Sequence, residues 1–341
     1  MNSEYFLGAN SSRGFYSLYS EFCSGEADYL HIIKGGPGTG KSGFMRRIGR
    51  AAEARGYDVE YVLCSGDPDS LDGVYIPALH RAWVDGTAPH VTEPRCFGFD
   101  SNYVNLGHFC KTPMPAHDKR KVMEINQKYK ACYSCAYDYL KAAALLRKNR
   151  AGNAATAEQL KEIRGAIQGI LDMSAKRRSS SAHFVQRFMH AICCKGELYL
   201  SRGVYDLCKQ CYVVTTDKGS ASTVLRVAAE LGAAYVSRLI VCPDPLEPEL
   251  FEAVLLPELE LGFVSDGYGI EWAQELLPAQ MLSPGVEDES LEAEIRVRAL
   301  ALDRLRQAKE LHDELESFYK PAMDFAALDE FAEEYIKTAV E

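Results

Sequence analysis

The chain has 341 residues, of which 47% are hydrophobic and 25% are charged, and its formal net charge is −10. This length allows two domains with cores of their own, and this composition excludes a disordered chain and a coiled-coil rod. The sequence has no apolar run long enough to span a membrane, no signal-peptide pattern, and scattered cysteines, so we expect reduced thiols in a cytoplasmic protein.

The charge is divided unevenly between the two halves of the chain. Residues 1–178 carry 24 basic and 19 acidic residues, whereas residues 179–341 carry 14 basic and 29 acidic residues. The first half is therefore suited to anionic ligands. The second half repels phosphate backbones, which argues against nucleic acid as a partner.

A polar turn over residues 10–13 precedes the first predicted strand, residues 30–33. A segment in this place often lies beside the base or ribose of a nucleotide bound after that strand. Asn10 and Arg13 are therefore candidate nucleotide contacts. The alternative is a solvated turn that leads into a helix.

The strand over residues 30–33 leads into a Gly-rich loop, and a helix predicted for residues 42–55 follows. The loop matches the phosphate-binding pattern G-x-x-x-x-G-K-[ST], the Walker A motif of P-loop proteins. Its candidate ligand-binding residues are Gly35, Gly36, Pro37, Gly38, Thr39, Gly40, Lys41, Ser42 and the adjoining Gly43. We expect Lys41 to neutralise nucleotide phosphates and Ser42 to ligate Mg²⁺.

Acidic and polar side chains follow the next two predicted strands. Asp85 ends a strand over residues 82–85, as a Walker B carboxylate that holds Mg²⁺ does, and Thr87 and His90 follow as candidates to orient water. Within the cluster at 67–72, Asp69 is a candidate catalytic base for an acceptor hydroxyl. Ordinary turn and cap chemistry is the alternative for these residues.

Long amphipathic patterns end each half. The first half has helical periodicity over residues 119–150 and 157–175, and the second over residues 287–319 and 326–339. We expect a helical hairpin in each half. A polar linker over residues 176–181 separates the halves.

The two halves show the same order of elements at a shift of about 181 residues, which indicates a duplicated domain. In the second half the segment aligned with the loop is 216–223, where Ser222 aligns with Lys41 and, if one register gap is allowed, Ser265 aligns with Asp85. Without the lysine, and with Asp217 in the loop, a triphosphate meets less positive charge. We therefore expect a degenerate pseudo-site in the second half.

Several segments resemble a family of bacterial tandem P-loop ATPase-like proteins. They are residues 14–19, 34–42, 69–74, 76–77, 84–90 and 103–107. The resemblance covers nearly the whole chain and implies two P-loop NTPase domains and ATP binding. The loop of the second half departs from the family's pattern.

These observations predict an α/β fold of two tandem P-loop NTPase domains, each with a mostly parallel sheet, helices on both faces and a helical-hairpin extension. Residues 1–178 form the domain with the intact loop, extended over about 119–176. Residues 179–341 form the degenerate repeat, extended over about 287–341. The predicted function is ATP binding with Mg²⁺-dependent hydrolysis. The alternatives are a small-molecule or nucleotide kinase, and a non-hydrolysing switch that recruits a protein partner.

Overall fold

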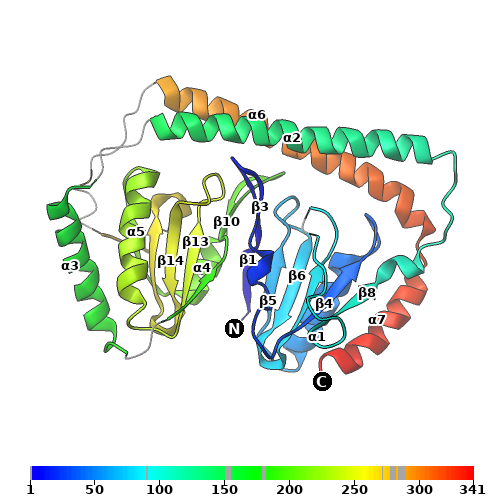
Figure 1. The fold of residues 1–341 in the computed structure, drawn as a ribbon, viewed down its shortest axis with the longest axis horizontal. Helices are drawn as coiled ribbons and strands as arrows, with labels where there is room; N and C mark the ends of the chain where they lie inside the picture. The colour runs from blue at the N-terminus through cyan, green and yellow to red at the C-terminus, as the bar shows by residue number, and fades with distance from the viewer. Residues whose placement is uncertain are drawn as a thin grey trace.

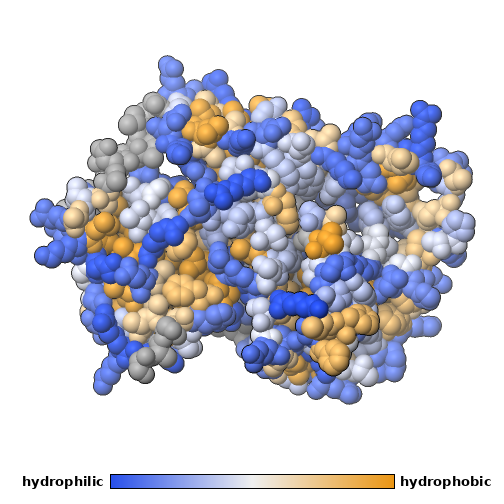
Figure 2. Space-filling model, viewed as in Figure 1, coloured by the Kyte–Doolittle hydropathy of each residue, from blue (hydrophilic) through white to orange (hydrophobic). Residues whose placement is uncertain are grey.

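The computed structural model describes residues 2–89, 91–149, 155–178, 182–270, 272–276, 282 and 289–341. Two six-stranded sheets lie beside each other, and two long helices run across one end of both (Figure 1). The chain is therefore an α/β protein, as expected. Within these ranges no helix is both long and apolar enough to cross a membrane. Figure 2 shows hydrophilic side chains spread over the viewed face, with a hydrophobic area over the second sheet.

The first sheet has the strand order β1-β5-β6-β7-β4-β8. Its strands are β1 (Ser3–Phe6), β5 (Glu60–Leu63), β6 (Leu71–Ile76), β7 (Arg81–Asp85), β4 (Tyr29–Lys34) and β8 (Ser101–Asn105). Strand β6 is antiparallel to both neighbours, and the other adjacent pairs are parallel. The expectation of a mostly parallel sheet is thus corrected to a mixed sheet. The reason is that short loops join β5, β6 and β7, whereas a parallel crossover needs about a dozen residues or more.

The second sheet repeats this order as β9-β13-β14-β15-β12-β16. Its strands are β9 (His183–Gln186), β13 (Arg238–Pro243), β14 (Phe251–Leu256), β15 (Leu261–Ser265), β12 (Gln210–Val214) and β16 (Gln274–Glu275). Here β14 is the strand that is antiparallel to both neighbours. The remaining pairs are parallel, so the two sheets agree in order and in direction.

Each half also has a β-hairpin and several short helices. The hairpins are β2 (Gly8–Ser11) with β3 (Gly14–Ser17), and β10 (His190–Cys193) with β11 (Gly196–Tyr199). The short helices are η1 (Tyr19–Glu21), η2 (Pro77–Leu79), η3 (Leu106–Phe109), α4 (Ser201–Leu207), η4 (Pro257–Leu259), η5 (Asp266–Tyr268) and η7 (Lys320–Ala322). The two hairpins lie between the two sheets (Figure 1).

The turn of each hairpin contacts the opposite half. Ser12 donates its backbone N–H to the carbonyl of Leu246 at 3.0 Å, and Cys194 donates to Gly66 at 3.4 Å. Two ion pairs also link the hairpin turns to the opposite half. Arg13 lies 2.9 Å from Glu249, and Lys195 lies 2.5 Å from Asp69. Two similar units related by a two-fold axis make such reciprocal contacts, in which matching positions of each unit touch the other unit.

The longer helices are exchanged between the halves. They are α1 (Lys41–Ala54), α2 (Lys119–Asn149), α3 (Ala157–Ser174), α5 (Lys218–Gly232), α6 (Glu289–Tyr319) and α7 (Phe325–Ala339). Helix α2 pairs with α6, α3 packs on α5 of the second half, and α7 packs on α1 of the first half (Figure 1). The expected hairpin within each half is therefore wrong. An amphipathic pattern defines the buried face of a helix but not its partner.

Three apolar clusters account for this exchange. In one, Ile163 and Leu171 of α3 pack with residues of α5. In another, Leu140 of α2 and Leu305 of α6 pack together. The largest cluster contains residues of both sheets, including Ile32 of β4 and Val264 of β15, together with α7. The two halves therefore share the largest of the three clusters as a common core.

Candidate functional site

The Gly-rich loop connects β4 to α1, as the sequence predicts. Gly38 and Gly40 have φ angles of 70° and 85°, a left-handed conformation that strains any other residue. Helix α6 also approaches the loop closely, since a Cβ at Gly38 would lie 3.2 Å from the Cβ of Glu316. Both the backbone angle and the neighbouring helix therefore require glycine at position 38.

Lys41 begins α1, and its ammonium group lies within the loop. Its Nζ donates hydrogen bonds to the carbonyl oxygens of Gly35 and Gly36, both at 3.0 Å. The same atom lies 3.5 Å from Oδ2 of Asp85, and the two side chains are only 12% and 13% exposed. Attraction at this distance and burial is stronger than it would be in bulk water. The loop thus surrounds a cation.

Asp85 reaches Lys41 because β7 is the direct neighbour of β4, and Asp85 pairs in register with Ile33. Its Oδ1 accepts hydrogen bonds from the backbone N–H of Thr87 at 2.9 Å and from the Thr87 hydroxyl at 2.6 Å. These two bonds orient the carboxylate so that Oδ2 faces Lys41. Thr87 therefore acts here by positioning Asp85.

Ser42 lies next to Lys41, and its hydroxyl faces β6. Its Oγ accepts a hydrogen bond from the backbone N–H of Leu71 at 2.9 Å. A hydroxyl oxygen has a second lone pair, which this bond leaves available. Because Mg²⁺ prefers oxygen ligands, Ser42 and Asp85 form a donor set that fits this cation.

A cavity of about 630 Å³ lies against the loop. All nine residues from Gly35 to Gly43 line it, together with Asp85 and Thr87. Helices α2 and α6 contribute another part of its wall, made of Asn126, Tyr129, Lys130, Tyr133, Lys309, His312, Leu315 and Glu316, and η7 adds Lys320. The first half of the chain thus begins the site, and a helix of the second half helps to close it.

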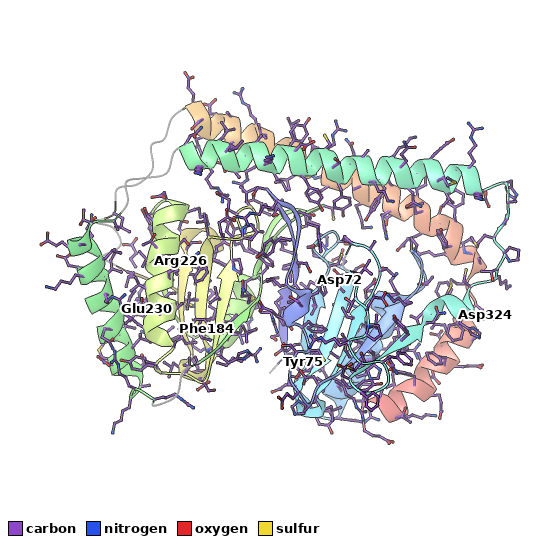
Figure 3. The ribbon with its side chains drawn as sticks, in the orientation of Figure 1. Asp72, Tyr75, Phe184, Arg226, Glu230 and Asp324 are labelled. Atoms are coloured by element: carbon purple, nitrogen blue, oxygen red, sulfur yellow. The ribbon has the colours of Figure 1, made fainter. Side chains whose placement is uncertain are left out.

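The three aspartates that follow β5 have different positions. Asp67 and Asp72 line the cavity. Figure 3 shows Asp72 at the end of the first sheet that faces α2 and α6, with Tyr75 at the other end. Asp69 lies outside the cavity lining, where a hydrogen bond from Lys195 lowers its pKa. Its side chain is 75% exposed, so it is poorly placed to be the predicted catalytic base.

The other predicted site residues have separate places. Asn10 lines the cavity and is 1% exposed, and its amide donates to the carbonyls of Ser65 and Ile192. Asn10 therefore also ties the two halves together. Arg13 does not line the cavity and pairs with Glu249 instead. His90 lies outside the described residues.

The residues from α2 and α6 are the part of the site that sequence reasoning missed. Tyr129 and Tyr133 follow the apolar stripe of their helix, and burial raises the pKa of both phenols. Lys309 and His312 occur in a helix rich in charges. Such residues are expected on any helix that is half buried, so the local sequence contains no signal that separates them from ordinary packing residues.

The second half has a closely related arrangement without the lysine at the loop's end. Ser222 Oγ accepts from the backbone N–H of Phe251 at 2.8 Å, which matches the bond between Ser42 and Leu71. Ser222 is therefore the counterpart of Ser42, which corrects the alignment of Ser222 with Lys41. The loop of the second half is one residue shorter, whereas the sequence comparison places its single gap after the loop.

Ser265 occupies the place of Asp85, as the alignment predicts, since it pairs with Val214 at the end of β12. Lys218 reaches this place from the start of α5. Its Nζ lies 3.1 Å from Ser265 Oγ and 3.0 Å from Oε1 of Glu252, which is fully buried. Burial lowers the pKa of Lys218, but Glu252 and Asp244 raise it by more, so the ammonium stays charged. An internal ion pair thus occupies this part of the second half.

Further charges surround that ion pair. His190 Nδ1 lies 3.1 Å from Glu252, and Arg147 of α2 lies 3.1 Å from Asp244 and 3.3 Å from Glu247. Burial raises the pKa of Asp244, but Arg147, Lys218 and His190 together lower it by more, so this carboxyl stays ionised. Arg147 belongs to the basic half and its partners to the acidic half. The uneven charge of the chain therefore serves contacts between the halves.

Scans of this chain against protein-family models, curated proteins and solved structures found no match. A proposal of function for this chain therefore rests on the loop motif and on the geometry around the loop.

Proposed function

We propose that the chain is an ATP-binding P-loop protein and a Mg²⁺-dependent ATPase, with its active site in the first half. One observation carries this proposal. Lys41, Ser42 and Asp85 meet at one end of the glycine loop and line the same cavity, with Lys41 Nζ 3.5 Å from Asp85 Oδ2. A cation, an oxygen donor and a carboxylate in this arrangement suit a magnesium triphosphate.

Each residue has a defined task in this proposal. Lys41 exchanges the carbonyls of Gly35 and Gly36 for the β- and γ-phosphates and neutralises their charge. Ser42 and Asp85 hold Mg²⁺, directly or through water, and Thr87 orients Asp85. The metal, when bound, stabilises the charge that develops on the phosphate oxygens during hydrolysis. Helix α1 adds the positive end of its dipole to the phosphate site.

We further propose that the second half is a degenerate copy of the same P-loop domain. The equal strand order and the matching bonds of Ser42 and Ser222 support the duplication. The ion pair between Lys218 and Glu252 supports the loss of nucleotide binding, because a triphosphate would meet a buried carboxylate there. The chain then has one active site and one pseudo-site.

A phosphotransferase is the second candidate, and the cavity favours it. The cavity extends past the loop to Asp67 and Asp72, and Asp72 is only 5% exposed. A carboxylate there is placed to accept the proton of an acceptor hydroxyl. Release of ADP that rises when small hydroxyl compounds are added would favour this reaction over hydrolysis.

Equilibrium binding of ATP with Mg²⁺ to the full chain tests the proposal. Lys41→Ala removes the loop's cation, so ATP binding is expected to fall by about a hundredfold or more. Arg50→Ala, on the same helix but outside the cavity lining, is the matched control and should bind as the wild type does. Unchanged ATP affinity in the Lys41→Ala protein would show that the site is wrongly assigned.

A further inference from the structure

Part of the wall that closes the cavity belongs to the second half of the chain. Lys309 and His312 lie about one turn apart on α6 and both line the cavity. The Lys309 ammonium lies 3.6 Å from Asp67 and 2.5 Å from Asp313. The ring of His312 lies against Tyr129 of α2, with the centroids 5.9 Å apart. Both side chains are thus held toward a site that begins on the other half.

The basic groups of the cavity influence one another. Burial lowers the pKa of His312, and the ammonium groups of Lys309 and Lys41 lower it further, against the effect of Glu316 and Asp313. Lys41 and His312 therefore share one electrostatic environment, although they come from different halves. A strongly negative ligand in this space would meet all three basic groups.

The proposed nucleotide site leaves one requirement unmet by the loop. A triphosphate has one more charged group than a diphosphate, and it lies beyond the phosphate that the loop surrounds. Lys41 offsets part of the charge of that group from the loop side, and stabilising the rest takes a donor from outside the loop. Asp67, which holds Lys309, is four residues before Leu71, whose N–H binds Ser42. Lys309 thus approaches the site on the side of the proposed metal ligand.

We propose that Lys309 and His312 bind the terminal phosphate of a nucleoside triphosphate, so that α6 distinguishes the triphosphate from the diphosphate. This inference rests on the nucleotide binding proposed above. Lys309 exchanges its contact with Asp67 for the phosphate, and His312 donates a hydrogen bond to the same group. Farther along α6, Leu305 packs in one cluster with Ile192 and Leu246 of the second half. Helix α6 is thereby packed against the second half.

The test is the ratio of the two affinities in the full chain. The Kd values of ADP and of a non-hydrolysable ATP analogue, both with Mg²⁺, are measured for the wild type, Lys309→Met and His312→Gln. We expect each variant to lose about tenfold or more in triphosphate affinity and to keep its ADP affinity within about threefold. Retained ADP binding also shows that the variant is folded. Arg306→Met, on the same helix but outside the cavity lining, is the control and should keep both affinities.

The outcomes separate this inference from the one on which it rests. If the wild type binds neither nucleotide, the proposed function fails, and this inference fails with it. If the wild type binds both but Lys309→Met and His312→Gln keep its ratio of affinities, only the role of α6 is refuted. Equal weakening of both nucleotides by Lys309→Met would also refute it, because Lys309 would then act on the whole site.

Discussion

Phe6 and Phe188 exchange backbone hydrogen bonds in both directions, with N–H to C=O distances of 2.9 and 3.0 Å. Phe6 ends β1, and Phe188 closely follows β9, so the edge strands of the two sheets meet at this pair. Both side chains are fully buried in the core that the halves share. The same position in each half therefore contacts its own counterpart.

The first prediction concerns the shared core. Phe188→Ala should lower the free energy of unfolding by about 3–5 kcal/mol, because it leaves a cavity where a large ring was buried. Both halves should still unfold together, since they share one core. The chain has one tryptophan in each half, Trp83 and Trp272, so single-tryptophan variants can follow urea denaturation of each half by fluorescence.

Phe184→Ala is the control for that measurement. Phe184 is four residues away on the edge strand β9 and is 47% exposed, so the change should cost only about 0.5–1 kcal/mol. Different midpoints for the Trp83 and Trp272 signals would contradict the prediction, because they would show halves that unfold independently.

The second prediction uses the matched pair Ser42 and Ser222. Replacing either by alanine leaves a backbone N–H without its acceptor, so both variants should lose about 1–3 kcal/mol of stability. Only Ser42→Ala should lose the gain in ATP affinity that Mg²⁺ provides. Calorimetric titration with and without Mg²⁺ measures that gain. An equal loss in Ser222→Ala would mean that the second loop also binds the nucleotide.

The third prediction concerns the ion pair of the second half. Lys218→Met leaves the buried carboxylate of Glu252 without its cation and should cost about 3–5 kcal/mol in urea denaturation. Adding Glu252→Gln removes the charge and should recover most of that loss. ATP affinity should stay unchanged in both variants. A folded Lys218→Met protein that no longer binds ATP would contradict the pseudo-site.

The fourth prediction is a loss of stability in acid caused by His31. Burial lowers the pKa of His31 to about 4, and the ring stacks on Trp83 with centroids 4.8 Å apart. The unfolded chain has an ordinary histidine pKa of about 6.5, so it binds the proton first as the pH falls. His31 should therefore remove about 2–4 kcal/mol of stability between about pH 6.5 and pH 4. Urea denaturation at both pH values measures the loss, which should be smaller in His31→Gln.

The sequence predicts the elements around the loop well, because their signals are local. Glycines, Lys41 and a preceding apolar strand define the loop, and a short apolar run ending in Asp85 defines the neighbouring strand. The equivalence of Ser265 and Asp85 also follows from the repeat. These features depend on residues that are close together in the chain, and the structure has each of them where the pattern indicates.

The sequence does not predict which helix packs against which sheet. The stripe of Ile163, Ile167 and Leu171 fits an apolar surface in either half, so periodicity alone could not assign α3 to α5. Periodicity likewise could not predict that Lys309 and His312 line the cavity, because it does not show which elements lie opposite their helix. Arg13 was assigned to the nucleotide because it belongs to a turn near the loop, yet Glu249 of the opposite half holds it.

The exchange of helices has a consequence for synthesis on the ribosome. Helix α1, which follows the loop, is covered by α7, which lies about 270 residues later in the chain, through contacts such as Phe44 with Phe331. The loop and both strands beside it therefore leave the ribosome long before their covering helix exists. A nascent chain that stops before α7 would lack this cover on α1, so the apolar face of α1 would stay exposed until α7 has been made.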